Sequence, residues 1–143
     1  MQPITITLNG REVSGYPGMT ILDLARESGV DIPTLCHDPH LAPSGACRVC
    51  LVEDENTGRL MASCVTPIAA GMVITTHSPR VTDHRRNIVK LLLASHPDSC
   101  MVCDKGNRCQ LRQLASDLGV GLIDFQRIPQ MAVVQEVNSF IER

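Results

Sequence analysis

One stretch dominates this sequence: His96-Pro-Asp-Ser-Cys100-Met-Val-Cys103-Asp-Lys-Gly-Asn-Arg-Cys109. Three cysteines and one histidine fall within fourteen residues, with three, two and five residues between successive members. Three thiols cannot all pair with one another, so the stretch is not a self-contained disulfide framework. The spacing is typical of metal ligands, and a loop bound to a metal can keep its shape without an apolar face.

Four more cysteines lie upstream, with ten, two and thirteen residues between them: Cys36, Cys47, Cys50 and Cys64. The two sets together use all seven cysteines of the chain. A glycine-containing run, 44–46, leads into Cys47, and such a loop can supply the backbone N–H donors that the sulfurs of a two-iron cluster need. Plant-type ferredoxins have only four residues between their first two cysteines, so this set differs from theirs.

Three interpretations of these residues compete. The one we favour places an iron–sulfur cluster in each set, in a protein that moves electrons and has no catalytic residue. A structural zinc protein, serving as an interaction module, would use the same residues as a four-cysteine site and a site of three cysteines and one histidine. For the second set, spacing alone divides iron and zinc evenly. A thiol redox enzyme using Cys47 and Cys50 leaves the other ligand candidates unexplained.

The composition of the chain limits which classes of partner and which cellular compartment we expect. Aromatic residues make up only 2% of the chain, and the net charge is −2 with mixed signs, so neither a stacking surface nor a basic stripe indicates nucleic acid. The N-terminus lacks a secretory signal, and the longest apolar run, 88–94, is too short to span a bilayer. Free thiols for metal binding require a reducing compartment, so we expect a cytoplasmic protein.

Local patterns predict a small sheet with one helix in the first half of the chain. Asn9-Gly10 between alternating segments predicts a hairpin of residues 4–8 and 11–16. Thr20 and Gly29 suit the two ends of a helix. After a long loop over residues 31–47, strands are expected at 49–53, 60–63 and 73–76, with a turn at 54–58.

The second half of the chain predicts two helices. Ser78-Pro79 opens a helix over 79–95, which ends because Pro97 disfavours helical backbone at His96. We expect its inward side chains to be Val81, Ile88, Val89 and Leu92, and its outward ones Arg85, Arg86 and Lys90. A short helix over 109–118 has one apolar side and Gly119 after it, and its N-terminal amides would face an anionic cluster. Beyond Gly121 the chain is apolar and is expected to be extended.

The cysteine motifs resemble the N-terminal region of the large iron–sulfur subunit of respiratory complex I. The same module occurs in diaphorase subunits of NAD-linked hydrogenases and formate dehydrogenases, and in iron-only hydrogenases. The match covers nearly the whole chain, and the residues that carry it lie between positions 36 and 111. They are Cys36, then Gly45-Ala-Cys47-Arg48-Val-Cys50, then Cys64, then His96-Pro97-Asp-Ser-Cys100-Met-Val-Cys103-Asp-Lys-Gly106-Asn-Arg-Cys109-Gln-Leu111.

The resemblance implies two clusters and a place for each. A [2Fe–2S] cluster would be held on a β-grasp domain by Cys36, Cys47, Cys50 and Cys64. A [4Fe–4S] cluster would be held in the following helical segment by His96, Cys100, Cys103 and Cys109. Histidine in place of a thiolate would make that cluster less negative and raise its potential, as histidine does in Rieske centres.

The resemblance also implies the organisation and the partners of the protein. We expect an α+β chain with a β-grasp [2Fe–2S] domain at 1–77, a helical [4Fe–4S] segment at 78–120 and an extended tail at 121–143 that docks on a partner. One partner would be a flavoprotein iron–sulfur subunit that oxidises NAD(P)H and carries the FMN. The other would be a catalytic or further iron–sulfur subunit. The expected function is electron relay within a hydrogenase, a formate dehydrogenase or a related complex.

Overall fold

The chain begins with the expected hairpin. In the computed structural model, which describes residues 2–97, 100–121, 124 and 126–128, β1 (Ile4–Leu8) pairs antiparallel with β2 (Arg11–Gly15). Asn9 and Gly10 have φ values of 50° and 78°. Both central residues of the turn are therefore left-handed, as a type I′ hairpin turn requires, and the Asn-Gly prediction is confirmed.

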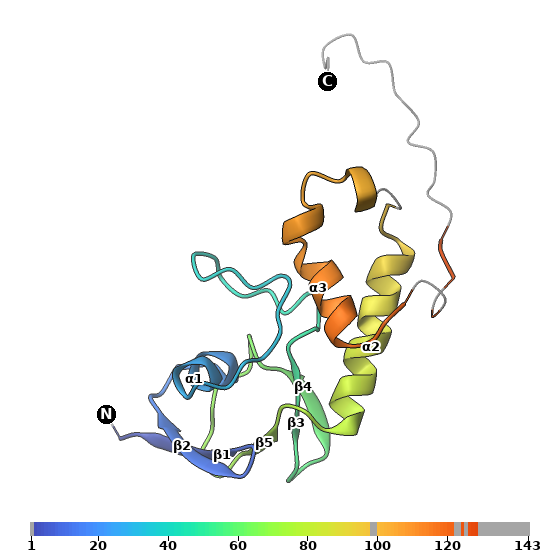
Figure 1. Ribbon diagram of the computed structural model, residues 1–143. Coiled ribbons are helices and arrows are strands. Elements are labelled where there is room, and N and C mark those ends of the chain that lie inside the picture. Colours follow the sequence, from blue (N-terminus) through green and yellow to red (C-terminus); the bar gives the residue numbers. More distant parts are fainter. Residues whose placement is uncertain (1, 98–99, 122–123, 125, 129–143) are drawn as a thin grey trace, which may run out of the picture.

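Five strands form one mixed sheet in the order β2-β1-β5-β3-β4 (Figure 1). The three later strands are β3 (Leu51–Asp54), β4 (Arg59–Ala62) and β5 (Val73–Thr75). The two strands β1 and β5, the first and last in sequence within this sheet, run parallel, and the other pairs are antiparallel. This mixed sheet with its helices is the α+β, β-grasp arrangement that the sequence predicts.

Helix α1 (Ile21–Glu27) packs against the sheet and completes the first core. Thr20 accepts a hydrogen bond from the backbone N–H of Asp23, whose carboxylate accepts one from the backbone N–H of Thr20. This reciprocal pair satisfies two N–H groups that the helix itself cannot. The apolar face of α1 is buried with side chains from the strands, and the cluster includes Ile6, Leu8, Ile21, Leu22, Leu24, Ala25, Val52, Ala62 and Ile74.

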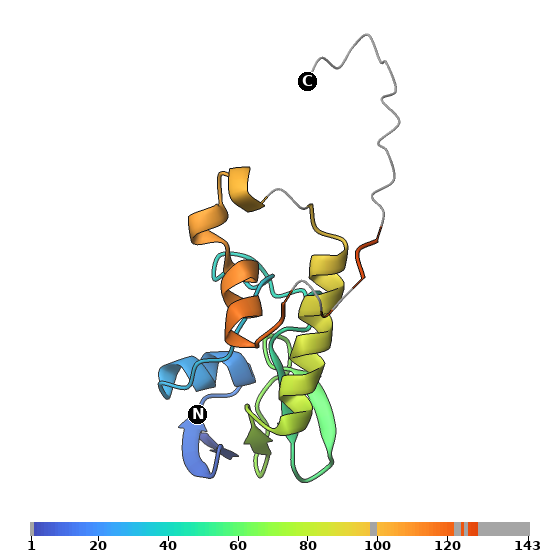
Figure 2. The ribbon, with the colours of Figure 1, turned by 45° about the vertical axis from the view of Figure 1, so that its right-hand side comes forward.

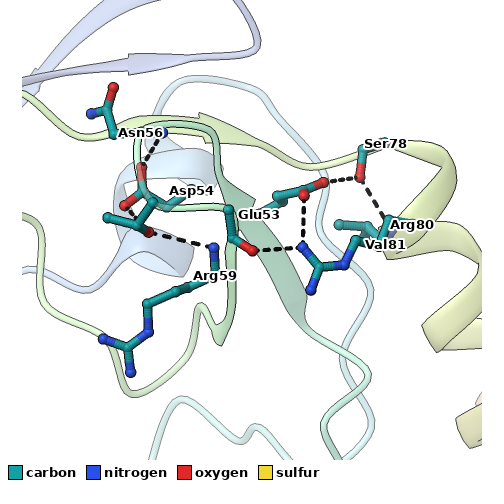
Figure 3. Close-up of polar contacts among 9 residues, drawn as sticks. Glu53, Asp54, Asn56, Arg59, Ser78, Arg80 and Val81 are labelled. Atoms are coloured by element: carbon teal, nitrogen blue, oxygen red, sulfur yellow. Dashed lines mark hydrogen bonds and ion pairs between the residues drawn. The ribbon is translucent and has the colours of Figure 1, made fainter.

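Helix α2 (Pro79–Ala94) lies alongside β3 (Figures 1 and 2). Its first turn is fixed to the sheet by Glu53, which accepts hydrogen bonds from the Ser78 hydroxyl and from Arg80, at 3.1 Å (Figure 3). The same figure shows the turn between β3 and β4, where the Asp54 carboxylate accepts bonds from the backbone N–H of Asn56 and the hydroxyl of Thr57.

One prediction for α2 is wrong. The charge of Arg85 predicts an outward side chain like that of Arg86, yet Arg85 is only 3% exposed. It lies four residues after Val81 and four before Val89, both fully buried, so it belongs to the inward stripe of the helix. The helical period, and not the charge, determines where this side chain lies.

A second core joins the cysteine loop, residues 28–50 between α1 and β3, to α2 and to the helix that follows it. Val49 from that loop is fully buried with Val89 of α2 and with Leu114 and Ala115 of α3 (Gln110–Asp117). Leu35 and Cys47 pack against the same cluster. The loop, drawn in cyan, accordingly reaches the side of α3 (Figure 1).

Beyond α3 the chain returns towards α2. The backbone N–H of Ile128 donates to the carbonyl of Ala94 at 2.9 Å. Most of the predicted extended tail, residues 129–143, lies outside the described residues. In the described part of the chain, no helix combines the length and apolarity needed to cross a membrane.

Candidate metal centres

The structure brings the four upstream cysteines into one region. The backbone N–H of Cys47 donates to Cys36 Sγ at 3.5 Å, and the Ser44 hydroxyl donates to the same sulfur at 3.9 Å. Cys50 Sγ and Cys64 Sγ are 3.3 Å apart. Residues separated by up to 28 positions in the sequence therefore meet between the long loop and the ends of β3 and β4.

The thiols of this set influence one another. Burial, the hydrogen bond from Cys50, and the nearby Cys50, Cys36 and Cys47 raise the pKa of the Cys64 thiol to about 12. The N–H of Cys47, followed by other donors in the loop, lowers the pKa of Cys36. The Cys64 thiol therefore resists ionising beside the other three sulfurs unless a cation joins them, which is the electrostatic setting of a cluster ligand set.

Backbone interactions hold Cys50 beside Cys64. Ser63 donates to the carbonyl of Cys50 twice, through its backbone N–H at 3.1 Å and its hydroxyl at 2.8 Å. Ser63 directly precedes Cys64, so these bonds fix the two ligand candidates relative to each other. Cys50 and Cys64 are 1% and 2% exposed, which keeps water from that side of the site.

The approach to Cys47 depends on an unusual backbone. Gly45 has a φ of 62°, and Arg48 has a φ of 59° although it is not glycine. A Cβ on Gly45 would lie 3.1 Å from Val65 Cγ2, so the loop lies directly against the residue that follows Cys64. The sequence predicts a Gly-containing loop here, but the contact with Val65 follows only from the folded chain.

The Arg85 side chain reaches the Cys47–Cys50 turn from α2. Its Nε donates to the carbonyl of Val49 at 3.0 Å, and its Nη2 donates to the carbonyl of Leu51 at 2.6 Å. The two carbonyls lie on either side of Cys50 in the chain. Sequence reasoning missed this residue, although its place in the apolar stripe of α2 could have revealed it.

The second set lies on two short helical turns before α3. Cys100 begins the 3₁₀ turn Cys100–Val102, and Cys109 follows the 3₁₀ turn Gly106–Arg108 and caps α3. The N–H of Gly106 donates to the carbonyl of Cys103 at 2.9 Å, and a Cβ on Gly106 would lie 3.0 Å from the carbonyl of Cys100. Glycine is thus needed where the chain turns back between the three cysteines.

His96 lies at the exit of α2, as predicted, with an exposed side chain. Its backbone N–H donates to the carbonyl of Leu93, and its Nδ1 lies 3.1 Å from the carbonyl of Pro97. Within the described part of the chain, no hydrogen bond joins its imidazole to Cys100, Cys103 or Cys109. Residues 98–99, which connect His96 to Cys100, lie outside that part.

The chemistry of the upstream set fits an iron–sulfur cluster. Its four potential ligands are all thiols, and the Cys36 sulfur accepts hydrogen bonds from the backbone N–H of Cys47 and the hydroxyl of Ser44. Thiolate ligands with N–H and O–H donors to their sulfurs are the chemistry that iron–sulfur clusters use. Among the described residues, no group of three or more Cys, His, Asp or Glu side chains is arranged to hold one metal ion.

Comparison with known proteins identifies the family. Residues 1–79 match the 2Fe-2S iron-sulfur cluster binding domain family. The chain belongs to that family. Residues 85–123 match a second one, the NADH-ubiquinone oxidoreductase-G iron-sulfur binding region. These matches confirm the expected resemblance and the presence of two iron–sulfur binding regions, and they give the zinc alternative no support.

This iron–sulfur chain is similar to parts of longer proteins. It is 43% identical over 125 residues to the NADP-reducing hydrogenase subunit HndD of Solidesulfovibrio fructosivorans, covering 84% of this chain and 21% of that protein. It is 40% identical over 116 residues to the mitochondrial NADH-ubiquinone oxidoreductase 78 kDa subunit of Candida albicans, covering 81% and 16%. The chain therefore spans about a fifth or less of the length of these relatives.

A solved structure shares the fold of this iron–sulfur chain. It comes from the crystal structure of an NAD+-reducing [NiFe]-hydrogenase in the H2-reduced state. The similarity has a TM-score of 0.81 at 34% sequence identity, and it covers 90% of this chain and 54% of that one.

Proposed function

We propose that this chain relays electrons within an NAD(P)-linked oxidoreductase complex. Electrons would come one at a time from a flavoprotein iron–sulfur subunit that oxidises NAD(P)H at FMN, and would leave to a catalytic or further iron–sulfur subunit. The convergence of Cys36, Cys47, Cys50 and Cys64 in a chain of this family carries the proposal. The hydrogenase and NADH-ubiquinone oxidoreductase relatives support the class of complex.

The proposal assigns each ligand set to one cluster and one part of the chain. The upstream cysteines would hold a [2Fe–2S] cluster in residues 1–77. A [4Fe–4S] cluster would be held in residues 78–120 by His96, Cys100, Cys103 and Cys109. For His96 to ligate iron, its side chain must give up its contact with the carbonyl of Pro97. Residues 121–143 would dock on a partner subunit.

Iron–sulfur clusters supply reversible electron transfer without making or breaking covalent bonds in a substrate. The residues of this chain would hold the clusters and adjust their energies. Backbone and hydroxyl donors to Cys36 stabilise negative charge on its sulfur, and the buried environment of Cys50 and Cys64 excludes water. Seven thiols that must stay reduced are consistent with a cytoplasmic location, which we include in the proposal.

Metal and sulfide analysis tests this proposal. Protein purified anaerobically should be brown and should contain about six iron and six acid-labile sulfide per chain, the sum of one two-iron and one four-iron cluster. Reduction should produce two distinct EPR signals. NADH or NADPH should reduce the chain only when the flavoprotein subunit is added. Colourless protein with zinc and no sulfide would refute the proposal in favour of the structural zinc module.

A further inference from the structure

Arg85 is a buried cation bonded to the backbone on both sides of a proposed cluster ligand. It is 3% exposed, and its guanidinium donates to the carbonyls of Val49 and Leu51, at 3.0 and 2.6 Å. Cys50 is the residue between those two carbonyls. The guanidinium of this α2 residue therefore hydrogen-bonds to the backbone on both sides of Cys50.

Among the described residues, no carboxylate forms an ion pair with this guanidinium. The ion pairs that α2 makes there are those of Arg80 with Glu53 and of Arg86 with Asp83, both at the surface. Burial lowers the pKa of Arg85, and the groups that oppose this effect are Cys50 first and Asp31 second. A buried cation needs a nearby anion, and the leading candidate is a cysteine sulfur.

We propose that Arg85 is the internal countercharge of the two-iron site, a positioning residue that orients Cys50 and raises the reduction potential of the cluster. This inference rests on the proposed ligand set. Four thiolates around an oxidised two-iron centre give a net charge of about −2, and one added electron makes it about −3. A fixed positive charge nearby stabilises the reduced form more than the oxidised form. No proton has to move, because arginine stays protonated in both states.

The two backbone bonds give Arg85 its second role. The carbonyl groups of Val49 and Leu51 each accept a hydrogen bond from Arg85, next to the proposed cluster. A planar guanidinium can bind both at once, whereas an ammonium cannot match that fork. Orientation of Cys50 therefore depends on the shape of the side chain, and the potential depends on its charge.

Potentiometric titration of the holo-protein, followed by EPR of the two-iron signal, tests the proposal. The one-electron donor is dithionite. At the wild-type midpoint, Arg85→Gln should lower the ratio of reduced to oxidised cluster at least roughly tenfold, which is about 59 mV for a one-electron couple. Arg85→Lys keeps the charge and should stay within roughly threefold of the wild type, with an altered line shape because Cys50 is held less firmly.

Arg86→Gln is the matched control. It removes the same charge from the next position of α2, where Arg86 contacts Asp83 and the carbonyl of Leu118, away from Cys50. It should change the ratio less than roughly threefold, because the exposed charge is screened. An equal shift in Arg85→Gln and Arg86→Gln would overturn the proposal, and so would an unshifted Arg85→Gln.

If Arg85→Gln does not retain the two-iron cluster, the midpoint measured on Arg85→Lys tests the proposal instead. If that variant holds the cluster but its ratio falls tenfold, charge is not what sets the potential and the proposal is overturned. Wild-type protein without a two-iron signal would refute the proposed ligand set itself. A normal wild-type signal with no effect of Arg85→Gln would refute only the role of Arg85.

Discussion

At the scale of single residues, Gly45 shows how closely the cysteine loop fits its surroundings. Its φ of 62° is left-handed, and a Cβ would lie 3.1 and 3.3 Å from the two methyl carbons of Val65. We predict that Gly45→Ala will cost about 1–2 kcal/mol in backbone strain and will also push the loop away from Val65. Cys47 would then move relative to Cys64. The rate of iron release to a chelator, measured by absorbance, should rise several-fold.

Gly58→Ala separates strain from crowding. Gly58 has nearly the same φ, 64°, but nothing lies within 4 Å of the position of its Cβ. This control should lower the thermal stability by a comparable amount and leave the rate of iron release near that of the wild type. If both variants lose iron equally fast, the contact between Gly45 and Val65 has no role in holding the site.

At the scale of elements, local signals in the sequence determine the helices well and the strands less well. Helix α2 begins at Pro79, as predicted, because Ser78 caps it by accepting from the N–H of Val81. Strand β3 begins at Leu51 and not at residue 49, and the carbonyl of Val49, before the strand, is bonded to Arg85 of a distant element. Such a long-range contact leaves no local pattern. The candidate ligands could be found from spacing, but Arg85 and the contact of Gly45 with Val65 depend on how distant elements pack.

The stability that Glu53 contributes at the junction of α2 and β3 should depend on pH. Hydrogen bonds from Ser78 and then Arg80 lower the pKa of Glu53 below its ordinary value of 4.5 (Figure 3). A carboxyl whose pKa is lower in the folded state adds stability above the unfolded pKa, and that contribution is lost as the pH falls through the folded value. We predict that Glu53→Gln will lower the melting temperature slightly at pH 7, and that the difference will shrink below about pH 4.5.

Circular dichroism melts at several pH values, each with the cluster content checked by absorbance because acid releases the sulfide of the clusters, measure this difference. Glu12→Gln is the control, because it removes the same charge from an exposed position on β2. A difference between wild type and Glu53→Gln that stays constant from pH 7 to below pH 4.5 would contradict the assignment of the ion pair.

At the scale of the whole molecule, the two ligand sets are held by different parts of the fold. The upstream set is fixed by the sheet, by Ser63 and by Arg85, which comes early in α2. Helix α2 then continues for nine residues past Arg85 to Ala94, and His96 follows its end. The second set is carried by the turns between α2 and α3. Damage at the end of α2 therefore leaves the contacts of the upstream set in place.

This division predicts the behaviour of His96→Ala. The four-iron EPR signal of the variant should fall at least roughly tenfold, because a ligand is removed. The two-iron signal and its midpoint potential should stay as in the wild type. His84→Ala is the matched control: it removes an exposed histidine from α2 itself, and both signals should persist. Loss of both signals in His96→Ala would show that the sites assemble as one unit. A full four-iron signal would instead exclude His96 as a ligand and leave three cysteines to hold that cluster.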